Sequence, residues 1–84
     1  MSKREDRVSL QDMFNHACEA VEMLGERTPE ELKTDRMMQL ALTRLVEIVG
    51  EAANRVTQET QGRYPHIPWT QIIGMRNRLI HGYD

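Results

Sequence analysis

The sequence predicts an all-α protein, an antiparallel helical bundle of three main helices and one short helix. Apolar residues recur at helical spacing along most of the 84 residues. Good helix formers such as Leu, Ala, Glu and Arg are frequent, whereas aromatic residues make up only 5% of the chain. The connections between the helical segments are short, which favours antiparallel neighbours. We therefore expect a single domain over residues 1–84, with residues 1–8 flexible.

Capping residues delimit the predicted helices. Ser9 is the expected N-cap of the first helix, and Gly25 follows its last turn as a residue that tolerates positive φ. Thr28, followed by a proline and two glutamates, predicts a short helix. Asp35 then caps the longest helix, whose broad apolar stripe continues to about Glu59 and indicates a central, well-covered position.

The C-terminal third is predicted to hold a loop and the last helix. Two prolines and a glycine predict a loop over residues 61–68, and Pro68 suits the first position of a helix that ends near His81. Gly50, in the longest helix, favours close approach of a neighbouring helix, although simple tolerance of a glycine remains open. A bundle this small leaves apolar surface exposed unless another chain covers it, so we expect a dimer.

Composition restricts the cellular setting. Cys18 is the only cysteine, so no internal disulfide can form, and its position on an apolar stripe predicts a packed, unreactive thiol. No apolar run approaches the roughly 20 residues that span a bilayer, and the N-terminus lacks the apolar region of a signal peptide. We expect a cytoplasmic protein without membrane contact.

The charge is unevenly distributed. Residues 1–60 hold eight Lys/Arg and twelve Asp/Glu, whereas residues 61–84 hold three Arg and a single acidic residue, Asp84. The first part therefore carries −4 and the second +2. Because a globally acidic chain is a poor nonspecific binder of nucleic acid, contact with a polyanion such as RNA is expected only in the C-terminal third.

Side chains of catalytic type are concentrated at the end of the last helix. They are Arg76, Asn77, Arg78, His81 and Tyr83. On a helix, Asn77 and Arg78 can share a face with His81, from which they are four and three residues away. Arg76 lies about 140° around the axis from His81, so these two converge only if the helix end distorts or a second chain contributes. A symmetric dimer would bring both residues of both chains into one cleft.

This set of residues can cleave RNA without a metal ion. A neutral imidazole takes the proton of a ribose 2′-hydroxyl, its protonated form delivers a proton to the leaving 5′-oxygen, and arginine holds the charged phosphorane. Two other interpretations stay open. The cleft can bind nucleotide or RNA without turnover, or Arg78 and His81 can simply complement the negative end of the helix.

Other residues are weaker candidates for chemistry. The three histidines lack the spacing of metal ligands, so no metal or cofactor is expected. Glu47 and Glu51 lie four apart on the central helix and could form a carboxylate pair. Such residues more often lie at a solvated edge or pair with a nearby arginine, here Arg44 or Arg55.

The C-terminal motif resembles that of a known family. Arg76, four residues, His81, one residue and Tyr83 is similar to the signature of the HEPN domain in its HepT-like toxin subgroup, and Asn77 matches the polar residue that commonly follows the arginine. The flanking stretches 45–53 and 64–77 resemble the central helix of the family and its approach to the motif. The resemblance covers most of residues 10–84.

The resemblance implies the toxin of a type VII-like toxin–antitoxin system. Such a toxin is a homodimeric, metal-independent ribonuclease, with Arg76 and His81 catalytic and Asn77 and Arg78 in support. Its partner is a minimal nucleotidyltransferase antitoxin that adenylylates the motif tyrosine, here Tyr83, and so blocks RNA by bulk and negative charge. A HEPN dimer that binds RNA or docks the nucleotidyltransferase without catalysis is the alternative. Family members usually continue into another helix, which is expected to be missing from a chain that ends just after the motif.

Overall fold

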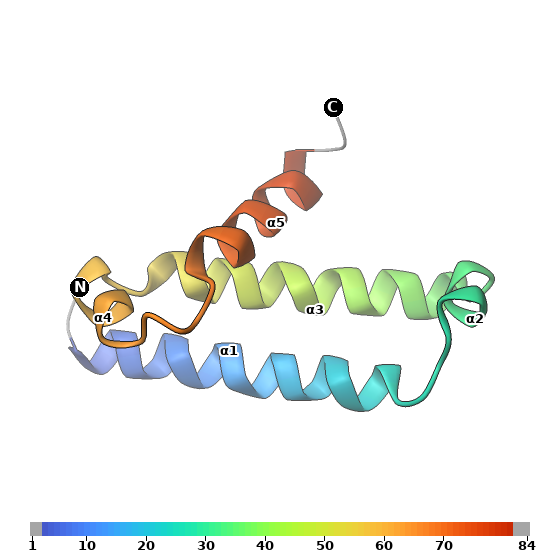
Figure 1. The fold of residues 1–84 in the computed structure, drawn as a ribbon, viewed down its shortest axis with the longest axis horizontal. Coiled ribbons are helices and arrows are strands. Elements are labelled where there is room, and N and C mark those ends of the chain that lie inside the picture. The colour runs from blue at the N-terminus through green and yellow to red at the C-terminus, as the bar shows by residue number, and fades with distance from the viewer. Residues whose placement is uncertain (1–2, 82–84) are drawn as a thin grey trace.

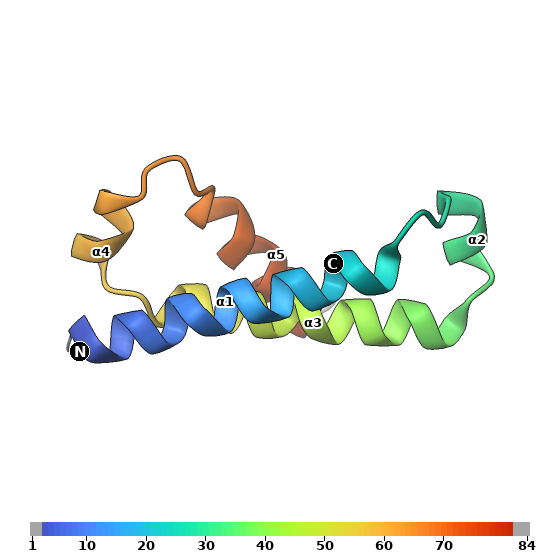
Figure 2. The ribbon, with the colours of Figure 1, turned by 90° about the horizontal axis from the view of Figure 1, so that it is seen from below.

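The computed structural model describes the backbone of residues 3–81 and the side chains of residues 5–78. Its helices are α1 (Lys3–Leu24), α2 (Pro29–Lys33), α3 (Arg36–Arg55), α4 (Gln58–Arg63) and α5 (Trp69–His81). The long helices α1 and α3 lie side by side in opposite directions, with α2 and α4 at the two ends of this pair (Figures 1 and 2). Helix α5 packs on α3 and crosses it obliquely, rising away from α1 (Figure 1). The predicted all-α bundle is confirmed, with two short helices where one was expected.

The connections around α2 follow the predicted capping chemistry. Gly25 adopts a φ of 53° directly after α1, as a C-terminal stop requires. The backbone N–H of Thr28 donates to the Glu31 carboxylate at 2.9 Å, and the Glu31 N–H donates to the Thr28 hydroxyl at 3.2 Å, which together form a capping box. Asp35 caps α3 by accepting a bond from the Met38 N–H at 3.0 Å. Each of these signals was predictable because it joins residues close in sequence.

The prediction that the first helix starts at Ser9 is wrong. Helix α1 begins at Lys3, and Ser9 lies within it with only 4% of its surface exposed. The reason is a long-range contact, because Asp6 is equally buried and accepts hydrogen bonds from Thr57 and Thr60, near the start of α4. The helix therefore includes most of the segment that was expected to be flexible.

The same contact divides the predicted central helix. We expected one helix to about Glu59, followed by a loop from residue 61, but α3 ends at Arg55 and α4 begins at Gln58. The backbone N–H of Thr57 donates to Asp6 at 3.0 Å, and the Thr57 hydroxyl accepts a bond from the Thr60 N–H at 3.3 Å, as an N-cap does. Helix α1, with 22 residues, is therefore longer than α3, with 20.

The last helix begins close to its predicted start. Pro68 lies one residue before α5 and accepts its first helical hydrogen bond, from the Ile72 N–H at 3.0 Å. The indole N–H of Trp69, the first helical residue, donates to the Tyr64 carbonyl at 3.0 Å, which anchors the preceding loop. The described part of α5 ends at His81.

One small apolar core joins α1, α3 and α5. It consists of Met13, Ala52, Ala53, Val56 and Trp69, with Leu10, Val49, Ile67, Ile72 and Ile73 packed around it. Two alanines at the centre let α1 and α5 approach α3 from different sides. The core lies towards the α4 end of the molecule, so it holds the first half of α5 firmly against α3.

The outer face of α1 is more exposed than its apolar pattern suggested. Phe14 and Val21 are 64% and 69% exposed, and the predicted packed thiol of Cys18 is exposed as well, which corrects that prediction. Met13 of α1 packs in the core with α3 and the start of α5, whereas the later turns of α5 rise away from α1 (Figure 1). Within residues 3–81, no helix is both long and apolar enough to cross a bilayer.

Candidate functional site

The predicted site residues lie in the last two turns of α5 and just beyond it. Arg76, Asn77 and Arg78 belong to α5, as does the backbone of His81, whose side chain is outside the described part of the structure. Tyr83 also lies outside the described residues. Because α5 stays α-helical through His81, the positions of Arg76 and His81 are about 140° apart around its axis. Within one chain, the helix therefore directs these two positions to different sides.

Arg76 lies where α5 crosses α3. Its Cβ and Cγ lie directly above Gly50, which is buried in α3 and has no side chain to keep the two helices apart. A methyl group on Gly50 would lie 2.2 Å from the Arg76 Cβ and 2.8 Å from its Cγ, distances that real carbon atoms do not reach. The predicted close approach at Gly50 is thus confirmed, and the neighbour is the first part of the Arg76 side chain.

The guanidinium of Arg76 is held but incompletely partnered. Its Nη1 donates to the Asn77 Oδ1 at 2.8 Å. Its Nε is buried and has no hydrogen-bond partner among the described residues, a rare state for a buried donor in a folded protein. Arg78, two positions on, is exposed. Asn77 therefore orients Arg76, and no other hydrogen bond of the guanidinium to a described residue is found.

The carboxylates on α3 beside Gly50 are engaged with other arginines. Arg44 lies 3.6 Å from Glu47 and 3.8 Å from Glu51, and Arg55 lies 3.8 Å from the other oxygen of Glu51. This is the arginine-paired arrangement that the sequence left open as the alternative to a catalytic carboxylate pair. None of the ion pairs within residues 5–78 includes Arg76, so its positive charge is not neutralised by a described carboxylate.

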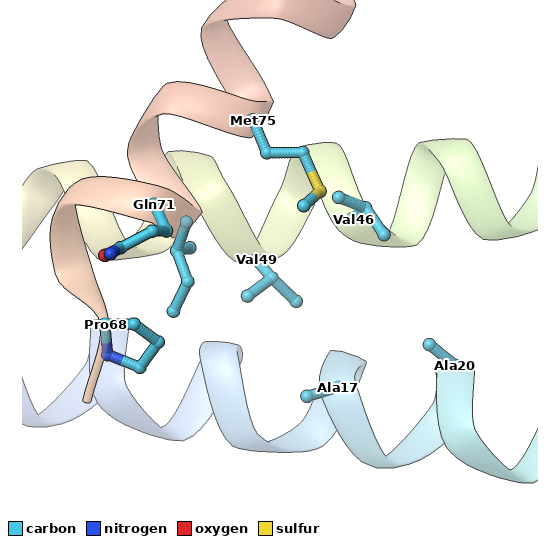
Figure 3. A pocket seen from close by; sticks show the side chains of 8 residues that line it. Ala17, Ala20, Val46, Val49, Pro68, Gln71 and Met75 are labelled. Atoms are coloured by element: carbon cyan, nitrogen blue, oxygen red, sulfur yellow. The ribbon is translucent and has the colours of Figure 1, made fainter. Parts of the chain in front are cut away.

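An apolar cavity of about 330 Å³ lies between α1 and α5, over α3 (Figure 3). It is lined by Ala17, Ala20, Val46, Val49, Pro68, Gln71, Ile72 and Met75. Met75 reaches towards Val46 across it (Figure 3). The sequence did not reveal this cavity, because its walls come from three helices whose crossing angles are set by tertiary packing. None of these lining residues is charged.

The remaining histidines have local roles. The Nδ1 of His16 lies 2.7 Å from the Asp12 carbonyl, one helical turn earlier. The exposed ring of His66 meets Tyr64 edge to face, with 6.4 Å between the ring centroids. Within the described part of the chain, His, Cys, Asp and Glu side chains do not gather in any group of three or more that could hold a metal ion.

Fold and site together define a small helical domain with an Arg-x4-His motif at the end of its last described helix. The chain belongs to the ribonuclease HepT-like family, whose model matches residues 14–84. A protein of Methanocaldococcus jannaschii named "Putative RNase MJ1380" is 32% identical over 83 residues, which are 99% of this chain and 76% of that protein. "Probable ribonuclease HepT" of Thermococcus cleftensis is 34% identical over 79 residues, 89% of this chain and 72% of that protein. No solved structure matches the chain significantly.

Proposed function

We propose that this chain is the ribonuclease toxin of a toxin–antitoxin pair and that it cuts RNA at a cleft between two copies of itself. The observation that carries the proposal is the Arg76 guanidinium, which Gly50 and Asn77 hold in place while its charge stays unpaired within the described residues. A fixed, partly desolvated cation of this kind suits a phosphate that gains charge during reaction. Family membership and the ribonuclease names of the relatives agree with this use.

The proposed reaction is an internal transesterification. The neutral imidazole of His81 takes the proton of the ribose 2′-hydroxyl, whose oxygen attacks the adjacent phosphorus. Arg76 stabilises the charged phosphorane, and the 5′-oxygen leaves with a proton delivered by an imidazolium. The products are a 2′,3′-cyclic phosphate and a free 5′-hydroxyl. This route needs only these side chains, with Arg78 offering a further contact to the RNA backbone.

The geometry of α5 supports the proposal of two copies. The helical positions of Arg76 and His81 are about 140° apart around one axis, so a two-fold arrangement that pairs Arg76 of one copy with His81 of the other would assemble the site. The exposed apolar residues Phe14 and Val21 add a physical reason for association, because their burial would stabilise a chain with so small a core.

The proposed control of the toxin acts at Tyr83. A nucleotidyltransferase antitoxin would transfer AMP from ATP to the phenol oxygen, with release of pyrophosphate. The added nucleotide places bulk and negative charge two residues from His81, where an RNA phosphate has to bind. The support for this partner is the resemblance of the motif and the family match.

A cleavage assay in EDTA tests the proposed function. We expect the purified chain to cut RNA without divalent metal and to leave 2′,3′-cyclic phosphate ends. His81→Ala should abolish cleavage, whereas His66→Ala, which removes an exposed histidine from a loop outside α5, should leave it intact. Intact RNA with the folded wild-type chain, together with binding of that RNA, would favour the alternative function, a non-catalytic RNA-binding or docking dimer.

A further inference from the structure

The crossing of α3 and α5 is built around a single glycine. Besides the two Arg76 carbons, the Ile72 carbonyl oxygen lies 3.2 Å from the place where a Gly50 methyl group would stand. The contacted atoms are a backbone oxygen and the two carbons nearest the Arg76 backbone, so rotation of the Arg76 side chain cannot remove its Cβ from the contact. Any side chain at this position forces α5 away from α3, and the displacement is greatest at Arg76, where the contact is closest.

Two other glycines show that this closeness is specific. Gly74, in the same helix as Arg76, and Gly62, in α4, have no heavy atom within 4 Å of the position of an added methyl group. Both could be replaced by alanine without a clash. Of these three glycines, only Gly50 has neighbours that leave no space for a side chain. The closest of these neighbours is Arg76, the arginine of the proposed site.

We propose that Gly50 is a positioning residue for Arg76, an inference that rests on the proposed ribonuclease function. The first two side-chain carbons of Arg76 pack against the backbone of α3 at Gly50. Asn77 holds the far end of the same side chain through Nη1. Held at both ends, the guanidinium presents its remaining donors in one orientation, and little side-chain freedom is left to lose when phosphate binds.

A methyl group at Gly50 would change the place of Arg76 more than the fold of α5. To reach an ordinary contact of 3.4 Å or more, the Arg76 Cβ has to move by over about 1 Å. The start of α5 stays anchored, because Trp69 is in the core and bonded to the Tyr64 carbonyl. A catalytic group misplaced by about 1 Å loses on the order of 100-fold in rate.

The first experiment compares Gly50→Ala with Gly74→Ala in the RNA cleavage assay. Both variants add one methyl group to a helical glycine, so both gain the same helix propensity. We expect Gly50→Ala to lower kcat by about 10- to 100-fold with KM changed by less than about threefold, and Gly74→Ala to retain the wild-type kcat. Equal kcat values for Gly50→Ala and wild type would overturn the proposal.

A double-mutant cycle separates positioning from general damage to α5. If Gly50 acts through the arginine side chain, then Gly50→Ala should cause no further loss of rate in an Arg76→Gly background, which lacks the Cβ and Cγ that the added methyl group would meet. A further loss of tenfold or more would mean that the glycine supports the whole helix end, His81 included, and the positioning role would be wrong.

A measurement on the wild-type chain keeps the proposal testable if Gly50→Ala does not fold or if RNA is not cut. The buried Nε–H of Arg76 should exchange with solvent at least about tenfold more slowly than that of the exposed Arg78, by NMR of the arginine side chains. Slow exchange without RNA cleavage would retain the positioning by Gly50 while refuting the ribonuclease function. Equal exchange rates would refute the positioning itself.

Discussion

Two charged side chains in this molecule, Asp6 buried and Arg76 partly buried, are partnered to very different degrees. At the α1–α4 end, Asp6 is 4% exposed and accepts bonds from the Thr57 N–H, the Thr57 hydroxyl and the Thr60 hydroxyl at 3.0, 2.6 and 2.5 Å. At the α3–α5 crossing, Arg76 has a buried Nε with no partner among the described residues and a single bond to Asn77. One charge is fully engaged within the fold, and the other is held but left unused.

The difference is consistent with the proposed function, in which Asp6 stabilises the fold and Arg76 binds the RNA phosphate. A buried carboxylate with three donors is stabilised in its ionised form, and it ties the first helix to the start of α4. The buried Nε–H of Arg76 has no partner among the described residues, so the position of this side chain costs free energy and does not serve stability. The first region is therefore expected to respond to mutation in stability, and the second in activity.

The largest expected effect is the loss of RNA cleavage in Arg76→Ala. Arg76→Ala should lower the rate of RNA cleavage by about 100- to 1,000-fold, because the developing phosphorane loses its cation. The free energy of unfolding should change by less than about 1 kcal/mol, since the variant removes a buried, unpartnered N–H together with some packing. Cleavage kinetics and urea unfolding measure the two quantities.

Arg36→Ala is the matched control, because it removes an exposed arginine at the other end of α3. Its cleavage rate and stability should both stay near wild type. If Arg76→Ala unfolds the chain while Arg36→Ala does not, Arg76 belongs with Asp6 as a structural charge, and the contrast between the two regions disappears.

How far each region could be predicted depends on the range of its contacts. The sequence was sufficient for the capping box at Thr28 and the stop at Gly25, and it located the motif that contains Arg76 and Asn77, because all of these are local patterns. It was insufficient for Asp6, whose partners Thr57 and Thr60 are more than 50 positions away. One missed contact displaced both the start of α1 and the end of α3.

The site itself was predicted as a list of residues more than as an arrangement. The last helix was predicted to include the positions of Arg76 and His81, as α5 does, and the small residues of α3 correctly favoured close packing at Gly50. The identity of the neighbour at Gly50 could not be predicted, because it depends on the angle at which α5 crosses α3. The exposure of Cys18 was missed for the same reason, since an apolar stripe does not reveal which part of it a neighbour covers.

The next largest expected effect is the loss of thermal stability in Asp6→Asn. Asp6→Asn should lower the melting temperature by about 5–10 °C, because an amide replaces an acceptor of three hydrogen bonds with a group that must also donate. Glu19→Gln removes the same charge from an exposed position of α1 and should change the melting temperature by less than about 2 °C. RNA cleavage by the folded Asp6→Asn chain should match wild type; a loss like that of Arg76→Ala would show that the two regions are not separate.

The smallest expected effect is the pH dependence that Asp6 gives to stability. The hydroxyl of Thr57, followed by that of Thr60, holds the pKa of the Asp6 carboxyl below its ordinary value of 3.8. A carboxyl whose pKa is lower in the folded than in the unfolded chain stabilises the fold fully above about pH 4–5, and this contribution is lost as the pH falls through the folded pKa.

The advantage of wild type over Asp6→Asn in unfolding free energy should therefore be constant from about pH 5 to 7 and shrink below about pH 4. Some acid sensitivity should remain in the variant, because the Thr28 backbone N–H and hydroxyl also lower the pKa of Glu31. Urea unfolding at a series of pH values measures the difference. A gap that stays the same down to pH 3 would mean that Asp6 keeps its ordinary pKa in the folded chain, and that its hydrogen bonds do not favour the ionised form as the contrast with Arg76 requires.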